Sequence, residues 1–208
     1  MDRTRCGWCE GSDLYRNYHD TEWGVPVFDD SRHFEFLVLE SAQAGLSWIT
    51  ILKKRENYRR AYDGFDPEKT ARYTKRKIET LLADPGIVRN RLKIEASVNN
   101  ARRFLEIQDE FGGFSRYIWD FTGGRPVTGT WKTLAELPAR TGLSDRLAAD
   151  MKKRGFRFLG STIMYAHMQA TGIVNDHLTG CFRYRELKKA SFPQAGGGPE
   201  GISRSGLS

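Results

Sequence analysis

The chain has 208 residues, of which 33 are Lys or Arg and 26 are Asp or Glu, so its formal net charge is +7. This length suits one ordinary domain or two small lobes, and it excludes a chain too short to bury a core. The positive surplus favours a polyanionic partner, such as nucleic acid or an anionic membrane surface.

The sequence contains no recognisable membrane-spanning segment or secretory signal. No apolar run approaches the roughly 18 residues that span a bilayer. The opening stretch, MDRTRCGWCEG, lacks the apolar segment that a secretory signal needs. We therefore expect a cytoplasmic protein whose thiols stay reduced. Its three cysteines, an odd number, fit a disulfide framework poorly and a metal site better.

Helical signals dominate along the chain. A capped apolar run predicts a helix over 29–45, and 66–86 predicts two short capped helices. A long amphipathic helix is expected over 89–113, and a helix, a tight turn and a second helix over 142–172. Strand-like alternation does not persist beyond about five residues. The expected fold class is therefore all-α.

The end of the chain differs in composition. Residues 191–208 are rich in Gly, Ser and Pro and have almost no apolar side chains, which is typical of a disordered tail. We expect a helical domain over 1–188 and a disordered tail over 189–208. Because the last stretch carries one Glu and one Arg, the positive charge lies in the helical domain.

Metal-ligating residues occur near both ends of the helical domain. His177 precedes Cys181 by four residues, so the two share a face if this segment is helical. Cys6, Cys9 and His19 lie near the start. Structural zinc is almost always bound by four thiolate or imidazole ligands, and such a site leaves no position for a reactive water. The alternative is that these are unrelated buried residues. The other two histidines, at positions 33 and 167, are expected to be structural.

Four segments carry a resemblance to a known family. They are RCGW at 5–8, YHDTEWGVP at 18–26, QAGLSWITILKKRENYR at 43–59 and KKRGFRFLGSTIMYAHMQATGIVNDHLTGC at 152–181. Together they strongly resemble 3-methyladenine DNA glycosylase I. The resemblance covers nearly the whole helical domain, and its blocks are long and occur in order.

The resemblance implies a helix-hairpin-helix DNA glycosylase fold and a structural zinc ion that ties the N- and C-terminal ends together. The family's zinc-binding pattern falls on Cys6, His19, His177 and Cys181. Cys9 lies where the pattern needs no ligand. We expect it to be a spare thiol, with competition against Cys6 as the alternative.

A glycosylase takes its target base out of the DNA stack and holds it in a pocket by stacking and edge hydrogen bonds. Five aromatic residues are candidates for lining such a pocket: Trp8, Tyr15, Tyr18, Trp23 and Trp48. An aromatic core cluster is the alternative. Against it stands the number of Tyr and Trp side chains, whose polar atoms need partners when they are buried.

Glu40 is the most informative single residue. On the helix expected from about Ser31, it shares a face with Phe36, Leu37 and Ala44. A glutamate on an apolar face is rarely buried without a partner or a function. If the helix is rotated slightly, Glu40 is instead solvated.

The resemblance implies that the glutamate at this position recognises the methylated base. We carry that role to Glu40, with Trp48 and Tyr18 as stacking and positioning partners. Methylation at N3 makes adenine a cation, so the pocket needs mainly to attract that cation, by carboxylate attraction and cation–π contact, and to stabilise the developing sugar cation. No lysine stands out as a Schiff-base nucleophile, so a monofunctional hydrolase is expected, acting on 3-methyladenine in double-stranded alkylated DNA as a monomer, with no membrane partner.

The basic segment 152–162 is predicted to form the DNA-binding hairpin. Gly155 and Gly160 are expected to allow tight turns, and Lys153 and Arg157 to attract phosphates. Amide groups at the start of the following helix can bind a phosphate. A solvated basic helix end is the alternative. A second basic stretch over 52–60 either follows DNA or faces water.

The wider helix-hairpin-helix superfamily commonly places a catalytic Asp shortly after the hairpin. Asn175 occupies that position in our alignment, and a slip of one residue would place Asp176 there instead.

Two other functions fit part of this pattern. A non-catalytic, zinc-stapled helical DNA-binding module explains the charge and the metal, but gives Glu40 no role. A zinc hydrolase needs one of the four ligands, Cys6 or His19 first, to be replaced by water.

Overall fold

The computed structural model describes residues 3–43 and 45–191, and the all-α expectation is confirmed there. The elements are η1 (Gly7–Cys9), α1 (Asp13–Thr21), α2 (Asp30–Gln43), α3 (Trp48–Ala61), α4 (Pro67–Ala71), α5 (Lys75–Ala83), α6 (Arg91–Phe111), α7 (Phe114–Asp120), β1 (Val127–Thr128), η2 (Leu134–Glu136), α8 (Gly142–Lys153), α9 (Ser161–Ala170), β2 (Val174–Asn175) and α10 (Phe182–Lys189).

The predicted helices correspond to α2, α4, α5, α6, α8 and α9, and four further helices, α1, α3, α7 and α10, lie outside the predicted ranges. The two strands are two residues long and pair in parallel, Val127 with Val174. The tail expected over 189–208 starts too early, because Lys189 belongs to α10. Residues 192–208 lie outside the described part of the chain.

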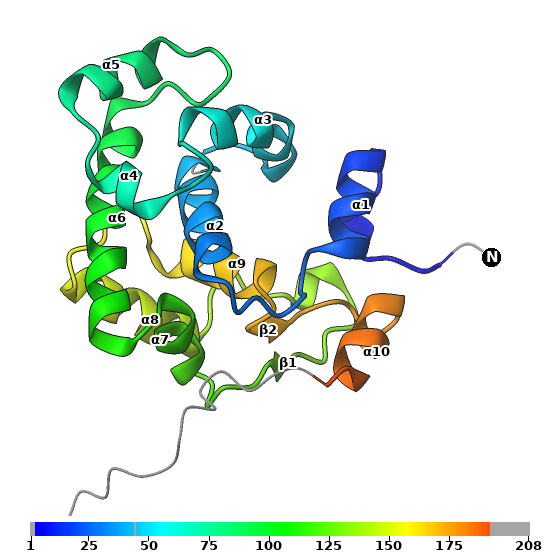
Figure 1. The fold of residues 1–208 in the computed structure, drawn as a ribbon. Helices are drawn as coiled ribbons and strands as arrows, with labels where there is room; N and C mark the ends of the chain where they lie inside the picture. The colour runs from blue at the N-terminus through cyan, green and yellow to red at the C-terminus, as the bar shows by residue number, and fades with distance from the viewer. Residues whose placement is uncertain (1–2, 44, 192–208) are drawn as a thin grey trace, which may run out of the picture.

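Helix α2 forms the centre of the fold (Figure 1) and packs against α3, α6, α7 and α9. Every residue from His33 to Ala42 is buried, so this part of the helix has no solvent face. The expectation that a small rotation would leave Glu40 solvated is therefore wrong. The largest core cluster surrounds α2 and α6, and a second, smaller one contains Tyr18, Trp23 and Phe36.

Side-chain caps fix the helix ends around this centre. Asn90 caps α6 through the backbone amide of Lys93, and the helix ends at Gly112 in the left-handed region, with φ of 73°. The carboxylate of Asp30 accepts hydrogen bonds from the first two backbone amides of α7, those of Phe114 at 2.8 Å and Ser115 at 2.7 Å. These bonds lock α7 against the start of α2.

The two ends of the helical domain lie together, with α1 and α10 on the same side of the molecule (Figure 1). The amide of Phe182 donates to the carbonyl of Thr4 at 3.0 Å. Among the described residues, no helix has the length and apolar character needed to cross a membrane.

Candidate active site and metal centre

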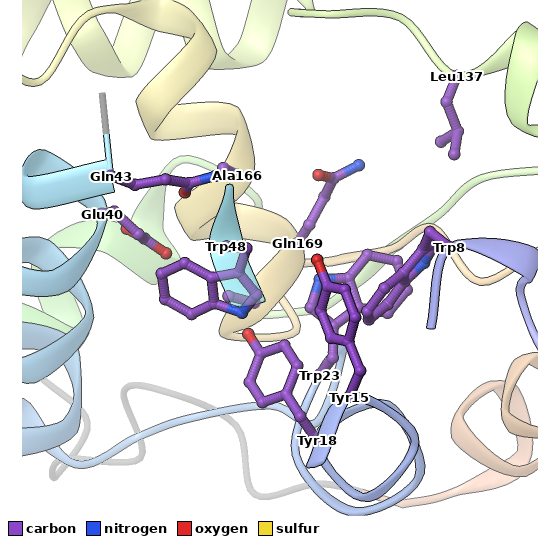
Figure 2. Close-up of a pocket in the computed structure, with 11 residues that line it drawn as sticks. Trp8, Tyr15, Tyr18, Trp23, Glu40, Gln43, Trp48, Leu137, Ala166 and Gln169 are labelled. Carbon is purple, nitrogen blue, oxygen red and sulfur yellow. The ribbon is translucent and has the colours of Figure 1, made fainter. Parts of the chain in front are cut away.

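A pocket of about 220 Å³ opens where α1, α2, α3 and α9 meet. All five aromatic residues expected from the sequence line it, together with Glu40 (Figure 2). The remaining lining residues are Gln43, Leu137, Ala166, Gln169 and Ala170. The volume suits one planar, purine-sized molecule. The same aromatic residues also make up much of the smaller core cluster, so they both pack on one another and line an opening.

The aromatic rings meet mainly edge to face or at a tilt, the arrangement that their quadrupoles favour. Trp8 lies 5.0 Å from Tyr15 and 5.1 Å from Trp23, measured between ring centroids. The Tyr18 and Trp48 rings lie 5.7 Å apart at a tilt of 52°. These walls leave aromatic faces and edges toward the cavity.

Local chain geometry brings Trp48 beside Glu40. Glu40 lies in the last turn of α2, and Trp48 is the first residue of α3. The short connection turns through Gly45, whose φ of 82° is unfavourable for residues with a side chain. Phe36, one turn before Glu40, stacks on Trp48 at 6.4 Å between ring centroids.

Glu40 is only 2% exposed. Its Oε2 lies 2.8 Å from Nδ1 of His167, while Oε1 is buried and has no hydrogen-bond partner among the described residues. Burial in these apolar surroundings raises the pKa of the Glu40 carboxyl well above its ordinary value. An unpaired carboxyl oxygen in a pocket is a group that a ligand can satisfy.

A second buried glutamate was not singled out from the sequence. Glu35 accepts from Nε of Arg55 at 2.8 Å and from Nη2 of Arg59 at 2.7 Å, and it also pairs with Arg32. Arg55 additionally reaches Glu22 at 2.7 Å. Arg55, whose side chain is 14% exposed, thus points inward, so neither interpretation of the basic stretch 52–60, DNA contact or plain solvation, describes this residue.

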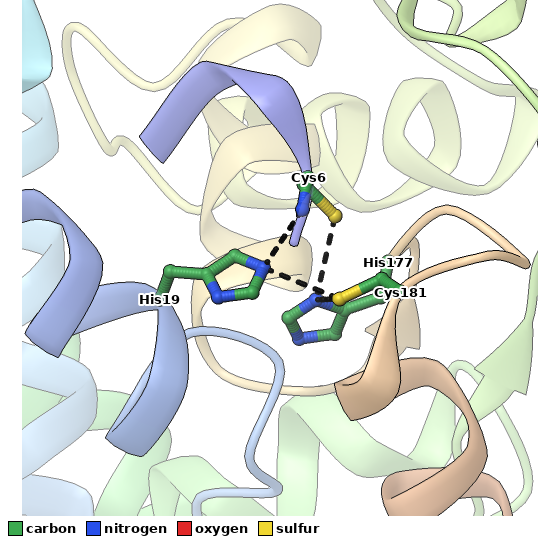
Figure 3. Close-up of side chains that lie close together, drawn as sticks. All are labelled: Cys6, His19, His177 and Cys181. Carbon is green, nitrogen blue, oxygen red and sulfur yellow. Dashed lines mark hydrogen bonds between the residues drawn. The ribbon is translucent and has the colours of Figure 1, made fainter. Parts of the chain in front are cut away.

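The four residues that the family pattern assigned to a metal come together. Cys6, His19, His177 and Cys181 are buried, and their ligand atoms lie within 4.8 Å of one another. Figure 3 shows the two cysteines and two histidines pointing into one space. The Cys181 sulfur lies 3.5 Å from Nε2 of His19 and 3.7 Å from Nδ1 of His177. This group has the donors and proximity to hold a metal ion.

The outer nitrogen of each histidine is already engaged, which fits metal binding by the inner one. Nδ1 of His19 lies 2.7 Å from Asp20, and Nε2 of His177 lies 3.0 Å from the carbonyl oxygen of Trp23. Because that carbonyl can only accept, His177 keeps a lone pair on Nδ1, facing the cysteines. The hydrogen bond from Cys6 lowers the pKa of Cys181 and so favours its thiolate.

Cys9 stays outside the metal-binding group. Its thiol donates to the backbone carbonyl of Cys6 at 3.1 Å. Burial raises the pKa of Cys9 to about 11, so it remains a neutral thiol. The arrangement supports a spare structural thiol over competition with Cys6.

The hairpin expected to bind DNA lies between α8 and α9. Gly155 has a φ of 86°, as expected for a tight turn, whereas Gly160 has a φ of −71°, which any residue adopts. The expectation that Gly160 is needed for a turn is therefore wrong. Sequence reasoning also missed Phe158, whose φ of 58° and exposed ring are unusual for an aromatic residue. Lys153 and Arg157 are both exposed.

Asp176 is buried and has both carboxylate oxygens engaged. Oδ1 accepts from Nε1 of Trp131 at 2.7 Å, and Oδ2 accepts from the Tyr165 hydroxyl and from Nε2 of Gln169 at 3.0 Å. Neither Asp176 nor Asn175 lines the pocket. The geometry gives Asp176 a structural role, holding Gln169 at the pocket wall.

Comparison with known proteins gives one consistent result. Residues 8–184 match the methyladenine glycosylase family. The chain is 48% identical over 180 residues to DNA-3-methyladenine glycosylase 1 of Escherichia coli (strain K12), covering 86% of this chain and 96% of that protein. It is 45% identical over 178 residues to DNA-3-methyladenine glycosylase of Haemophilus influenzae, with coverage of 86% and 96%.

Solved structures agree. A crystal structure of 3-methyladenine DNA glycosylase I matches with a TM-score of 0.83 at 48% identity, covering 86% of this chain and 98% of that chain. A Staphylococcus aureus 3-methyladenine DNA glycosylase I, solved to explain 3-methyladenine recognition, matches with a TM-score of 0.83 at 38% identity, covering 86% and 95%. The fold is thus that of a helical DNA glycosylase. This chain belongs to the methyladenine glycosylase family.

We predict that Cys181→Ser removes most of the bound metal and lowers the free energy of unfolding by several kcal/mol, because one ligand of a closed site is lost. Metal per chain measured by mass spectrometry, together with urea unfolding, checks this. Cys9→Ser is the matched control and should keep full metal content. Equal metal loss in both variants would contradict the assignment.

We predict that Glu40→Gln stabilises the protein increasingly as pH rises. The folded-state pKa of Glu40 is raised, so the wild type loses stability as pH rises above the ordinary value of 4.5 toward the folded-state pKa. The glutamine variant lacks this loss, and its advantage should grow by up to about 1.4 kcal/mol per pH unit. Urea unfolding of both proteins at pH 5, 6 and 7 measures it. A constant difference across that range would show that Glu40 titrates normally.

Proposed function

We propose that this protein hydrolyses the N-glycosidic bond of 3-methyladenine in alkylated double-stranded DNA. The observation that carries the proposal is the buried Glu40 carboxyl, with one unpaired oxygen, in a pocket walled by Tyr and Trp side chains. The names of the relatives support the same activity, since those proteins are DNA-3-methyladenine glycosylases.

In this proposal the damaged nucleotide is rotated out of the duplex and its base enters the pocket. Trp48 stacks on the base and Tyr18 positions it, while Trp8, Tyr15 and Trp23 complete the wall. A base methylated at N3 is a cation, and aromatic faces attract cations. Oε1 of Glu40 accepts a hydrogen bond from the exocyclic amino group, the donor that adenine offers.

Little acid or base chemistry is needed beyond this recognition. The methylated base leaves as a neutral molecule, so its bond to the sugar is already weak. The pocket favours the cationic base and the sugar cation that develops as the bond breaks, and water then attacks the sugar. Among the described residues no lysine lines the pocket, which supports a monofunctional hydrolase without a Schiff-base intermediate.

We propose zinc as the metal held by the Cys6, His19, His177 and Cys181 group, because two thiolates and two imidazoles are ligands that zinc prefers. Four protein ligands leave no position for a reactive water, which argues against a zinc hydrolase. The metal instead fixes one wall of the pocket, since the Trp23 ring lies 4.6 Å from that of His177.

The hairpin supports the DNA-binding part of the proposal. The Asn100 side chain makes two hydrogen bonds to the backbone of Arg157. It accepts one from the amide at 2.8 Å and donates one to the carbonyl oxygen at 2.8 Å. This fixes the loop that presents Lys153 and Arg157. Gly160 caps α9 without a side chain, so the first amides of α9 stay open to a phosphate.

We predict that wild-type protein releases 3-methyladenine from methylated DNA and leaves 7-methylguanine in place, while Glu40→Leu, which removes the acceptor oxygen, lowers the single-turnover rate by about 10²-fold or more. Chromatography of the released bases measures this. Glu79→Gln, an exposed change on α5, is the control and should keep wild-type rates. If folded, metal-loaded wild type releases no base while still binding DNA, the non-catalytic module is the better description.

We predict that Lys153→Gln combined with Arg157→Gln weakens DNA binding and lowers the slope of log K against log salt by about 1.8, or about 0.9 for each lost phosphate contact. Fluorescence anisotropy at several salt concentrations measures the slope. The control, Lys75→Gln with Arg76→Gln on α5, removes the same charge elsewhere. Equal slopes in both double variants would mean that the hairpin is not the contact.

A further inference from the structure

A chain of hydrogen bonds runs from the pocket into the core behind Glu40. Glu40 Oε2 lies 2.8 Å from Nδ1 of His167. Nε2 of His167 lies 3.1 Å from Nδ1 of His33. Nε2 of His33 lies 3.0 Å from the carbonyl oxygen of Val27. Both imidazoles are fully buried, and neither lines the pocket.

The Val27 carbonyl, at the end of this series of hydrogen bonds, determines where every proton in the series lies. A carbonyl oxygen only accepts, so Nε2 of His33 carries a hydrogen and, in the neutral ring, Nδ1 is the acceptor. His167 must then donate from Nε2, which leaves its Nδ1 as an acceptor. The remaining donor is Glu40, whose carboxyl carries its proton on Oε2. Oε1 is consequently a carbonyl-type oxygen that can only accept.

In the alternative protonation state, the proton has moved from Glu40 to His167, which leaves an ionised carboxylate beside a positively charged imidazolium. This state would place two charges in a buried site, which is costly. Burial lowers the pKa of both His33 and His167 to about 3, and burial raises that of Glu40. Both shifts favour the uncharged arrangement.

We propose that His33 and His167 are positioning residues for base selectivity: they hold the proton of Glu40 on Oε2, so that Oε1 presents an acceptor and no donor to the pocket. This inference rests on the proposed function. Adenine offers an amino group at its C6 edge, whereas guanine offers an acceptor oxygen there. With the proton fixed on Oε2, Oε1 can accept a hydrogen bond from the amino group of 3-methyladenine. The C6 oxygen of 3-methylguanine would instead face a second acceptor, so its binding is disfavoured.

Replacing His33 should release this constraint without touching the pocket. When Nδ1 of His33 is absent, His167 can carry its hydrogen on Nδ1 and donate to Oε2. Glu40 can then place its own proton on Oε1 and donate to the guanine oxygen. Selectivity should fall although every residue that lines the pocket is unchanged.

The first test is direct. Nitrogen-15 NMR of the wild-type, metal-loaded protein labelled at its four histidines reports which ring nitrogens carry hydrogen. We expect His33 and His167 to be neutral, with hydrogen on Nε2 and none on Nδ1, between pH 5 and 8. A hydrogen on Nδ1 of His167 would overturn the proposal. This measurement needs no enzymatic activity, so its outcome is independent of the proposed function.

The second test compares release of 3-methyladenine and 3-methylguanine from the same methylated DNA. For His33→Leu we expect the ratio of the two single-turnover rates to fall by about tenfold or more, the factor expected when a buried hydrogen-bond mismatch is relieved. Phe34→Leu, the neighbouring fully buried residue on α2, is the matched control. It should lower stability and leave the ratio unchanged.

The possible outcomes distinguish a failure of the proposed histidine role from a failure of the proposed glycosylase activity. A folded His33→Leu protein with the wild-type ratio would overturn the role of the histidines while leaving the glycosylase activity intact. Wild type that releases neither base would instead remove the proposed function, and the NMR result would still decide where the Glu40 proton lies. If His33→Leu does not fold, the NMR measurement on wild type remains the deciding one.

Discussion

The burial of one carboxyl group, that of Glu40, governs the arrangement of the rest of the site. Glu40 is 2% exposed, one of its carboxyl oxygens is bonded to His167, and the other has no hydrogen-bond partner in the part of the chain that the structure describes. Leaving a buried polar atom unpaired costs about 1–3 kcal/mol, so the fold tolerates here a cost that a correctly shaped ligand removes. Phe36 stacks on Trp48 beside the carboxyl, and His167, which is itself bonded to His33, holds the carboxyl from behind.

The pocket walls come from segments that are far apart in the chain, so separate interactions have to hold them in place. The Cys and His group joins the segment before α1 to the segment before α10, and it lies directly behind Trp23. On the other side, Arg55 of α3 is fixed to Glu35 of α2 and Glu22 beyond α1. Both interactions tie helices together at points adjacent to the aromatic walls.

The sequence predicted what residue type and spacing encode locally. Six helices, five candidate metal ligands, and Glu40 with its aromatic neighbours were singled out this way, whereas the choice of Cys6 over Cys9 and the role of Glu40 came from the family resemblance. It could not show that α2 is buried on every face from His33 to Ala42, so Glu35 escaped notice and Arg55 was interpreted as surface charge. The contact between His33 and His167 joins residues 134 positions apart and leaves no local pattern. Gly160 shows the opposite error, because a glycine in a turn motif need not have a positive φ.

The most direct test of the account is a crystal structure of the wild-type protein with free 3-methyladenine. We expect the base to lie against Trp48 and Tyr18 in the aromatic pocket, with its amino group within hydrogen-bond distance of Oε1 of Glu40 and with Oε2 still bonded to His167. A base bound outside the aromatic pocket, or one that turns a different edge toward Glu40, would contradict it.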